Sequence, residues 1–197
     1  MQYEIFIKTL YILSGGESSL VVVSIENIIA SCSLEHPVEL QQIALNTSNA
    51  TFDKERGNLL SIQWEQPRIA CLINAKGKII FTGAHSQEEI QEGLDRLRET
   101  LDAQHIDIPE QCELEITQVI ASTQLDTPLK LDQVQKQLPD DAVIYHSEQT
   151  PYIEYRLQHP NTVILVFNTG SLVACGPSID DVSKPLQDLA ETVTKKI

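Results

Sequence analysis

Two kinds of hydrophobic periodicity alternate along this chain. Segments 59–64 and 69–74 alternate apolar with other residues or stay apolar for a few positions, which is typical of β-strands. Segment 86–103 instead places its large apolar residues three or four positions apart, which predicts a helix with one buried face. That face is predicted to consist of Ile90, Leu94, Leu97 and Leu101.

The same series of predicted elements occurs twice, with a period of roughly 92 residues. Segments 28–31, 70–77 and 80–83 recur as 119–122, 163–170 and 173–176. The first copy is predicted to contain a strand at 20–31, a short helix at 37–45, strands at 59–64, 69–74 and 78–82, and a final helix at 86–103. The second is predicted to contain a strand at 114–123, a short helix at 129–138, strands at 152–157, 162–168 and 171–175, and a final helix at 179–195.

This repetition predicts an α+β fold in which two pseudo-symmetric repeats form one curved antiparallel sheet, a saddle with helices on its convex side. We expect an N-terminal extension and linker at 1–19, a first repeat at 20–107 and a second at 108–197. Within the extension, residues 3–7 are either an extra strand or a partner-binding tail, and 14–19 form the linker. The exposed sheet face is then a binding surface, unless a partner protein or a second copy in a homodimer covers it.

Composition and charge limit the function classes. The chain has 197 residues, 42% of them hydrophobic and 21% charged, as in ordinary globular proteins. Its formal net charge of -14 is unusual for a nucleic-acid binder, which normally has a basic face. Such a binder must confine its positive charge to a small surface, work in high salt, or bind weakly. No segment is long and apolar enough to cross a membrane, and the start does not resemble a signal peptide.

Catalysis and metal binding have little support in the sequence. The four cysteines form no CxxC pair and are interpreted as buried or half-buried thiols in a reducing compartment. The five histidines do not cluster at ligand spacing, and no nucleophile or phosphate-loop motif is present. We therefore expect no enzyme activity, no metal and no cofactor.

Several short motifs resemble those of the TATA-binding protein family. Segment 25–31, Ile-Glu-Asn-Ile-Ile-Ala-Ser, resembles the opening strand of the family core. Gln66-Pro67-Arg68, 75–78 and 82–84 resemble three further signatures, and 155–156, Pro160 and 163–170 match again in the second half. The resemblance covers residues 20–195. It implies that the concave sheet lies in the DNA minor groove, that Phe wedges kink the duplex, and that basic residues at the rim hold phosphates.

Carried over by position, the resemblance implies central amides and an apolar floor but few wedges. The two wedge pairs fall on Gly57 with Asn74 and on Thr150 with Phe167, so Phe167 alone is aromatic. We therefore expect reduced bending, or bending at the second-half end only. The residues predicted to bind DNA are Asn27, Ile29, Arg56, Arg68, Leu72, Asn74, Ile80, Thr82, Gln118, Ile120, Arg156, Leu165, Phe167 and Val173.

The family's partner, a transcription factor IIB-like protein, docks on an acidic loop of the second half. Tyr145 and Glu148 match this loop, and His146 replaces a second acid. The resemblance thus implies a transcription initiation factor that binds AT-rich promoter DNA. Its expected location is nuclear if the source is eukaryotic or viral, and cytoplasmic at the nucleoid if the source is archaeal. The alternative is a paralogue that does not bend DNA, whose concave sheet binds a protein, including its own N-terminal segment.

Overall fold

The structure is a computed structural model that describes residues 21–55, 57–109 and 112–194. The extension with its predicted strand and linker, and the predicted DNA-binding residue Arg56, lie outside these ranges. The chain divides into two compact units. We call Glu26–Gln118 the N-terminal unit, and Met1–Ile25 together with Val119–Ile197 the C-terminal unit.

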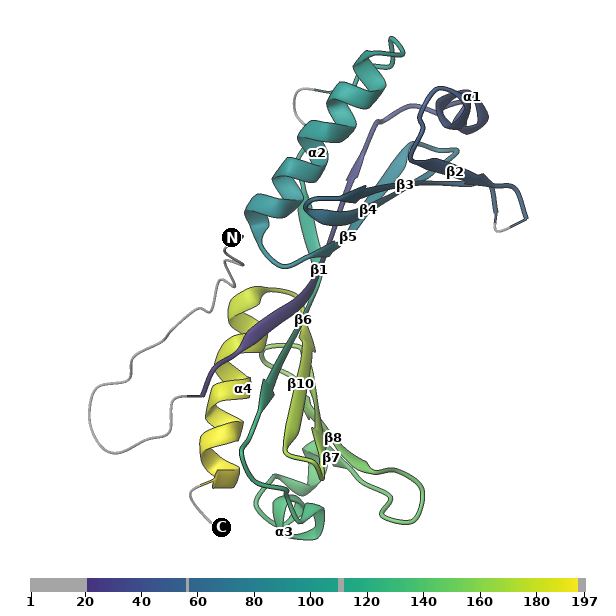
Figure 1. Ribbon diagram of the computed structural model, residues 1–197. Coiled ribbons are helices and arrows are strands. Elements are labelled where there is room, and N and C mark those ends of the chain that lie inside the picture. The colour runs from purple at the N-terminus through teal and green to yellow at the C-terminus, as the bar shows by residue number, and fades with distance from the viewer. Residues whose placement is uncertain (1–20, 56, 110–111, 195–197) are drawn as a thin grey trace. The chain divides into compact units, whose positions relative to one another are not determined.

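In the N-terminal unit, an antiparallel sheet with strand order β2-β3-β4-β5-β1 lies against helix α2 (Figure 1). A short helix, α1, precedes the edge strand β2. The elements are β1 (Ser24–Ser33), α1 (Leu40–Leu45), β2 (Ala50–Asp53), β3 (Leu59–Glu65), β4 (Arg68–Asn74), β5 (Lys78–Ala84) and α2 (Gln87–Asp102).

The C-terminal unit repeats this plan with strand order β7-β8-β9-β10-β6 and helix α4 against β9 and β10. Its elements are β6 (Glu115–Gln124), α3 (Leu131–Gln135), a 3-10 turn (Asp140–Ala142), β7 (Val143–Ile144), β8 (Tyr152–Leu157), β9 (Thr162–Phe167), β10 (Ser171–Gly176) and α4 (Ile179–Thr194). The α+β class and the antiparallel two-repeat plan predicted from the sequence are confirmed.

The two units exchange the ends of their first strands. Residues 21–25 belong to the C-terminal unit, where the Thr123 hydroxyl donates to the Val22 carbonyl oxygen at 2.8 Å. Residues 115–118 of β6 belong to the N-terminal unit, where the Thr117 hydroxyl donates to the Ile29 carbonyl oxygen at 3.2 Å. A compact unit is therefore not one uninterrupted repeat of the sequence.

Side chains alternate between the two faces of each sheet, as the strand period requires. In β4 and β5 every second side chain is completely or almost completely buried beneath α2. Burying one such aliphatic or aromatic side chain contributes about 1.5–3 kcal/mol. The core of the N-terminal unit includes Ile69, Cys71, Ile73, Ile79 and Phe81 from the sheet and Ile90, Leu94, Leu97 and Leu101 from α2.

Two tight turns and one helix cap fix the ends of these elements. Gly77 and Gly170, in the turns between β4 and β5 and between β9 and β10, have φ values of 85° and 87°, which glycine adopts without a Cβ clash. The Ser86 hydroxyl accepts a hydrogen bond from the Glu89 amide at 3.1 Å at the start of α2. The Glu89 carboxylate in turn accepts a hydrogen bond from the His85 amide at 2.7 Å. This pair resembles a capping box in which the second bond involves the residue before the N-cap.

Candidate DNA-binding face

The predicted floor residues of the N-terminal unit share the sheet face that α2 does not cover. Leu72 of β4 lies opposite Ile80 of β5, and Ala70 lies opposite Thr82. Their side chains are half-buried by one another, whereas the alternate residues are buried in the core. Ile29 and Asn27 of β1 have the same parity and continue this face on the next strand. Five of the residues predicted to bind DNA therefore lie on one face of this sheet: Asn27, Ile29, Leu72, Ile80 and Thr82.

Asn27 is held in a defined orientation on this face. The Gly83 amide donates to Asn27 Oδ1 at 2.7 Å, which identifies Oδ1 as the acceptor end of the side chain. Asn27 Nδ2 donates one hydrogen to the Thr82 hydroxyl at 3.1 Å. Because an amide nitrogen has two hydrogens, Asn27 can present its second one as a donor to a ligand that offers acceptors.

The first-half wedge positions are occupied by turn residues. Asn74 Oδ1 accepts hydrogen bonds from the amides of Lys76 and Lys78 at 2.9 and 3.1 Å, so this side chain caps the hairpin turn. Gly57 is exposed with a φ of 87°. Neither residue offers an aromatic ring, and Asn74 has a structural reason to be there.

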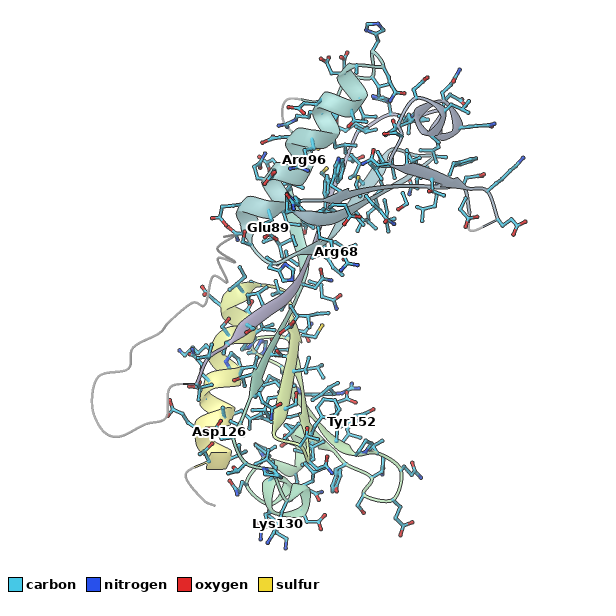
Figure 2. The ribbon with its side chains drawn as sticks, viewed as in Figure 1. Arg68, Glu89, Arg96, Asp126, Lys130 and Tyr152 are labelled. Carbon is cyan, nitrogen blue, oxygen red and sulfur yellow. The ribbon has the colours of Figure 1, made fainter. Side chains whose placement is uncertain are left out.

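Arg68, a predicted DNA-binding cation of the N-terminal unit, lies close to acidic residues. Arg68 is exposed at the end of β4, opposite Glu65 of β3, and Figure 2 shows it on the side of the sheet away from Glu89 of α2. Arg68 and Glu65 line a hollow of about 470 Å³ with Glu26, Asn27 and other residues of this unit. Arg68 thus lies among acidic neighbours on this face.

The C-terminal unit repeats the open face. Leu165 of β9 lies opposite Val173 of β10, which in turn lies opposite Ser122 of β6. Ile120 precedes Ser122 by two residues, so both side chains are on the same face of β6, and Ile120 lies opposite Cys175. All of these side chains are half-buried. Gln118 has the same parity as Ile120 on β6, but it belongs to the N-terminal unit.

An aromatic pair stands at the outer end of this second face. Phe167 lies opposite Tyr152 across β8 and β9, with ring centroids 5.5 Å apart and planes inclined by 52°. Such a tilted pair is favourable and leaves both rings on the open side. Figure 2 shows Tyr152 on the side of its unit away from α4. Sequence comparison by position pointed to Thr150 as the partner of Phe167, and the hairpin register supplies Tyr152 instead.

Arg156 is paired with an acid on the same face. Its Nε donates to the Glu154 carboxylate at 2.5 Å, and the side chains are 59% and 24% exposed, respectively. Glu154 lies opposite Leu165, within the apolar floor. A carboxylate at this position competes with a phosphate for the guanidinium group. Glu154 was not among the predicted site residues, although residues two apart on a strand share a face.

The predicted partner-binding residues lie in one loop between β7 and β8. Tyr145 is half-buried and Glu148 is exposed. The amides of Gln149 and Thr150 both donate to the His146 carbonyl oxygen, at 2.8 and 2.9 Å, so the loop is a defined turn. The acid is thus presented at the tip of an ordered segment.

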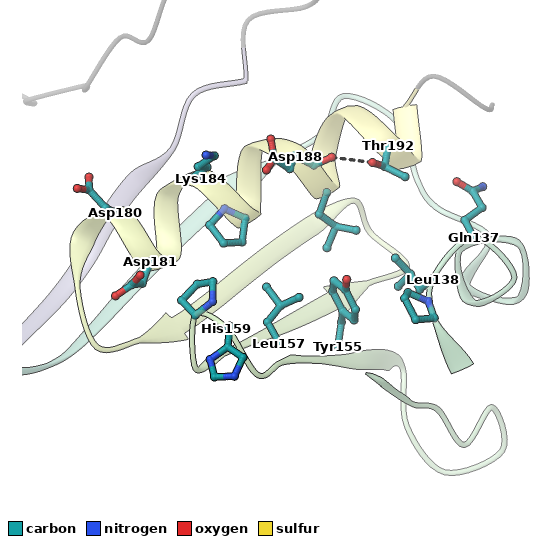
Figure 3. A pocket seen from close by; sticks show the side chains of 14 residues that line it. Gln137, Leu138, Tyr155, Leu157, His159, Asp180, Asp181, Lys184, Asp188 and Thr192 are labelled. Carbon is teal, nitrogen blue, oxygen red and sulfur yellow. Dashed lines mark hydrogen bonds between the residues drawn. The ribbon is translucent and has the colours of Figure 1, made fainter. Parts of the chain in front are cut away.

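The C-terminal unit also has a hollow on the side of α4. It has a volume of about 560 Å³ and lies between α4, β8 and the segment after α3 (Figure 3). Tyr155 and Leu157 contribute apolar surface, while Asp180 and Asp188 of α4 contribute acid. Gln137 Oε1 is buried here and has no hydrogen-bond partner among the described residues. Lys184 and His159 also line this hollow, so its charged groups are of both signs.

Within the described ranges, no group of three or more His, Cys, Asp or Glu side chains is arranged to hold a metal ion. Across the same ranges, no helix is both long and apolar enough to span a membrane. Each unit has an apolar open face, and in the N-terminal unit this face includes the oriented amide of Asn27.

Known proteins of similar sequence and fold are named as TATA-box-binding proteins. The family model described as "Transcription factor TFIID (or TATA-binding protein, TBP)" matches residues 22–103 and 113–196, one range for each repeat. The TATA-box-binding protein of Methanothermobacter thermautotrophicus is 35% identical over 154 residues, which are 78% of this chain and 84% of that protein. TATA-box-binding protein 1 of Haloferax volcanii is 31% identical over 154 residues, covering 78% of this chain and 82% of its own length.

A solved structure shows the same fold. The structure titled "Methanococcus jannaschii TBP" matches with a TM-score of 0.74 and 29% identity, and the match covers 88% of this chain and 98% of that one. The family model matches once in each half of this chain. The chain therefore belongs to the TATA-binding protein family, a family of non-enzymatic DNA-binding transcription factors.

Proposed function

We propose that this protein is a transcription initiation factor that binds AT-rich promoter DNA through the minor groove and bends it less than a protein with four aromatic wedges. The observation that carries the proposal is the uncovered face of each unit, a floor of Leu72 and Ile80 in one and Leu165 and Val173 in the other. Such aliphatic side chains fit the shallow surface that a widened minor groove offers.

The oriented amide of Asn27 supports a preference for A·T pairs. In the minor groove A·T and T·A pairs present only acceptors, adenine N3 and thymine O2, whereas G·C pairs add a donor. Asn27 Oδ1 already accepts the Gly83 amide, so the end of the side chain that remains for DNA is a donor. Gln118 is predicted to play the corresponding role in the second half.

Reduced bending follows from the asymmetry between the two outer ends of the faces. One end has Gly57 and the turn-capping Asn74, and the other has Tyr152 beside Phe167. Unstacking a base step costs a few kcal/mol, which an inserted ring helps to offset. We therefore infer that the duplex is kinked at the Phe167 end and stays smoother at the other.

Binding and bending are measured on one fluorescently labelled AT-rich duplex over a salt series, by anisotropy and by energy transfer between its ends. We expect salt-dependent binding with a smaller change in transfer efficiency than a four-wedge member of the family produces. Phe167→Ala and Tyr152→Ala should reduce bending more than affinity, whereas Leu45→Ala, which truncates a 75% exposed leucine on α1, should change neither. Absence of binding at the lowest salt would rule out the proposal.

Partner recruitment is the second part of the proposal. The ordered turn that presents Glu148 beside Tyr145 supports docking of a transcription factor IIB-like protein. We expect Glu148→Gln and Tyr145→Ala to weaken a ternary complex with such a factor and DNA while leaving DNA binding by this protein unchanged. Equal ternary complex formation by the wild type and both variants would contradict this docking site. The named relatives come from archaea, and on that ground we propose a cytoplasmic location at the nucleoid.

The alternative is that the open faces bind protein, including a second copy of this chain in the absence of DNA. The net charge of -14 and the pairing of Arg156 with Glu154 favour it, because both weaken attraction to phosphates. Sedimentation of the protein with and without the AT-rich duplex separates the two. A homodimer that persists at saturating DNA would support the alternative, and a protein that is monomeric without DNA would refute the homodimer.

A further inference from the structure

The connection between α2 and β6 is attached to the N-terminal unit at two points. The His36 ring Nε2 lies 3.3 Å from the Asp107 carbonyl oxygen. Further along, the Cys112 thiol donates to the Ser33 carbonyl oxygen at 3.7 Å, and it is near enough to the thiol of Cys32, the residue before Ser33, to help raise the pKa of that thiol. The sulfur atoms of Cys32 and Cys112 are therefore neighbours, although 79 residues separate Cys112 from Ser33 in the chain.

The strand register excludes another partner for Cys32 within this unit. Cys71 lies on β4, and β5 lies between β4 and β1. Neighbouring strands are about 4.7–4.9 Å apart, so the Cα atoms of Cys32 and Cys71 are separated by roughly 10 Å. A disulfide needs Cα atoms within roughly 7 Å. Cys175 belongs to the other compact unit.

The two neighbouring thiols differ in access. Cys32 is buried in the core side of β1, and burial raises the pKa of its thiol, an effect that the Arg98 guanidinium opposes. Cys112 is half-buried and open to solvent on the connection. A soluble reagent therefore reaches Cys112 first, and the buried Cys32 is the thiol that reacts second.

We propose that Cys32 and Cys112 are a site of intramolecular disulfide formation in the presence of a low-molecular-weight disulfide. The Cys112 thiolate attacks one sulfur of the reagent, whose S–S bond breaks and releases one thiolate that takes up a proton. Cys32 then loses its proton and attacks Cys112 in this mixed disulfide, which releases the second thiol. Two protein thiols are oxidised, and one molecule of reagent is reduced to two thiols.

The bond would fasten the connection to β1 without altering the open face. Cys32 shares the buried parity of Ala30, while Ile29 and Ser31 have the open-face parity. The closed loop of roughly 80 residues includes all of α1, β2–β5 and α2, so cross-linking it restricts the unfolded chain strongly. The expected change is a more stable N-terminal unit whose open face is unaltered.

The test uses the full chain, reduced or treated with oxidised glutathione, followed by intact mass measurement and peptide mapping without reductant. We expect the loss of two hydrogen atoms, one cross-linked peptide pair joining Cys32 to Cys112, and a thermal midpoint higher by roughly 5–15 °C. Cys112→Ser should abolish the cross-link and the shift. Cys175→Ser, a change at another half-buried cysteine, should leave both intact.

Three results would overturn the proposal. Glutathione that stays on Cys112 without ring closure would show that Cys32 cannot reach it. A cross-link from Cys32 to Cys71 would contradict the strand register. A cross-link between two chains would show that Cys112 meets a second molecule first. DNA binding plays no part in these outcomes, so the site stands or falls independently of the proposed function.

Discussion

Replacing Glu154 with Gln tests how the charge on the C-terminal face affects DNA binding. The substitution keeps the shape of the side chain but removes the carboxylate that accepts the Arg156 hydrogen bond. Arg156 is 59% exposed, so once released it can turn to a phosphate without crossing the core. We therefore expect Glu154→Gln to bind AT-rich duplex more tightly than the wild type, with a steeper salt dependence.

The size of the effect follows from counterion release. Each phosphate contact adds about 0.9 to the slope of log affinity against log salt concentration. Between roughly 50 and 200 mM salt, one additional contact therefore changes affinity by about 3.5-fold. The advantage of Glu154→Gln over the wild type should be largest at low salt and shrink by this factor over the series.

Anisotropy titrations of both proteins on the same duplex give the two slopes. Asp188→Asn is the matched control, because it removes the same charge from an exposed residue on α4. The double variant Glu154→Gln, Arg156→Gln should return to the slope of the wild type. Equal slopes for Glu154→Gln and the Asp188 variant would show that the effect is one of net charge, and the reasoning from the Glu154–Arg156 pair would be wrong.

Three further predictions concern stability. Gly77→Ala should lower the free energy of unfolding by about 2 kcal/mol or more, because its Cβ would lie 2.3 Å from the His36 carbonyl oxygen at a φ of 85°. Gly57→Ala has a similar φ but no atom within 4 Å of its Cβ, so it should lower the free energy of unfolding by only about 1 kcal/mol. Urea unfolding measures both changes, and equal costs would contradict the clash at Gly77. Hydrogen bonds from both ring nitrogens to carbonyl oxygens raise the pKa of His36, so its stabilising contribution is complete below the unfolded pKa of about 6.5 and is lost as pH rises through the folded value. His36→Ala should accordingly destabilise the protein more at about pH 5.5 than at about pH 8.5, and a cost independent of pH would refute this account. Gln137→Leu should raise the free energy of unfolding by about 1 kcal/mol, because it removes a buried acceptor without a described partner. The control Gln133→Leu, at an exposed site of α3, should change the free energy of unfolding by less than about 0.5 kcal/mol. A loss of stability in Gln137→Leu would mean that this oxygen has a partner.

The sequence predicted the long elements because their periodicity extends over several turns or pairs. Helix α2 and strands β4 and β9 begin and end within a residue or two of the predicted bounds. The strands β2 and β7 were not predicted, because four and two residues are too few to establish an alternation. They form because β3 and β8 each offer an edge to which a passing segment can bond.

The faces of the candidate site could be predicted, but the pairs on them could not. Alternation along one strand is enough to put Leu72 and Asn74, or Leu165 and Phe167, on the same side. The contact between Tyr152 and Phe167 depends on which residues of β8 and β9 are opposite, and hairpin register is set by the turn that joins them. For the same reason, the capping role of Asn74 became evident only with the turn at Lys76 and Lys78 in place.

The exchange of strand ends affects how the chain can be cut. A break after residue 107 separates the two sequence repeats, but it leaves the second fragment without residues 21–25, which the C-terminal unit includes. It also leaves the first fragment without residues 115–118, which the N-terminal unit includes. No single peptide bond divides this protein into its two compact units. Separately produced halves should therefore need each other to fold fully, as complementing fragments do.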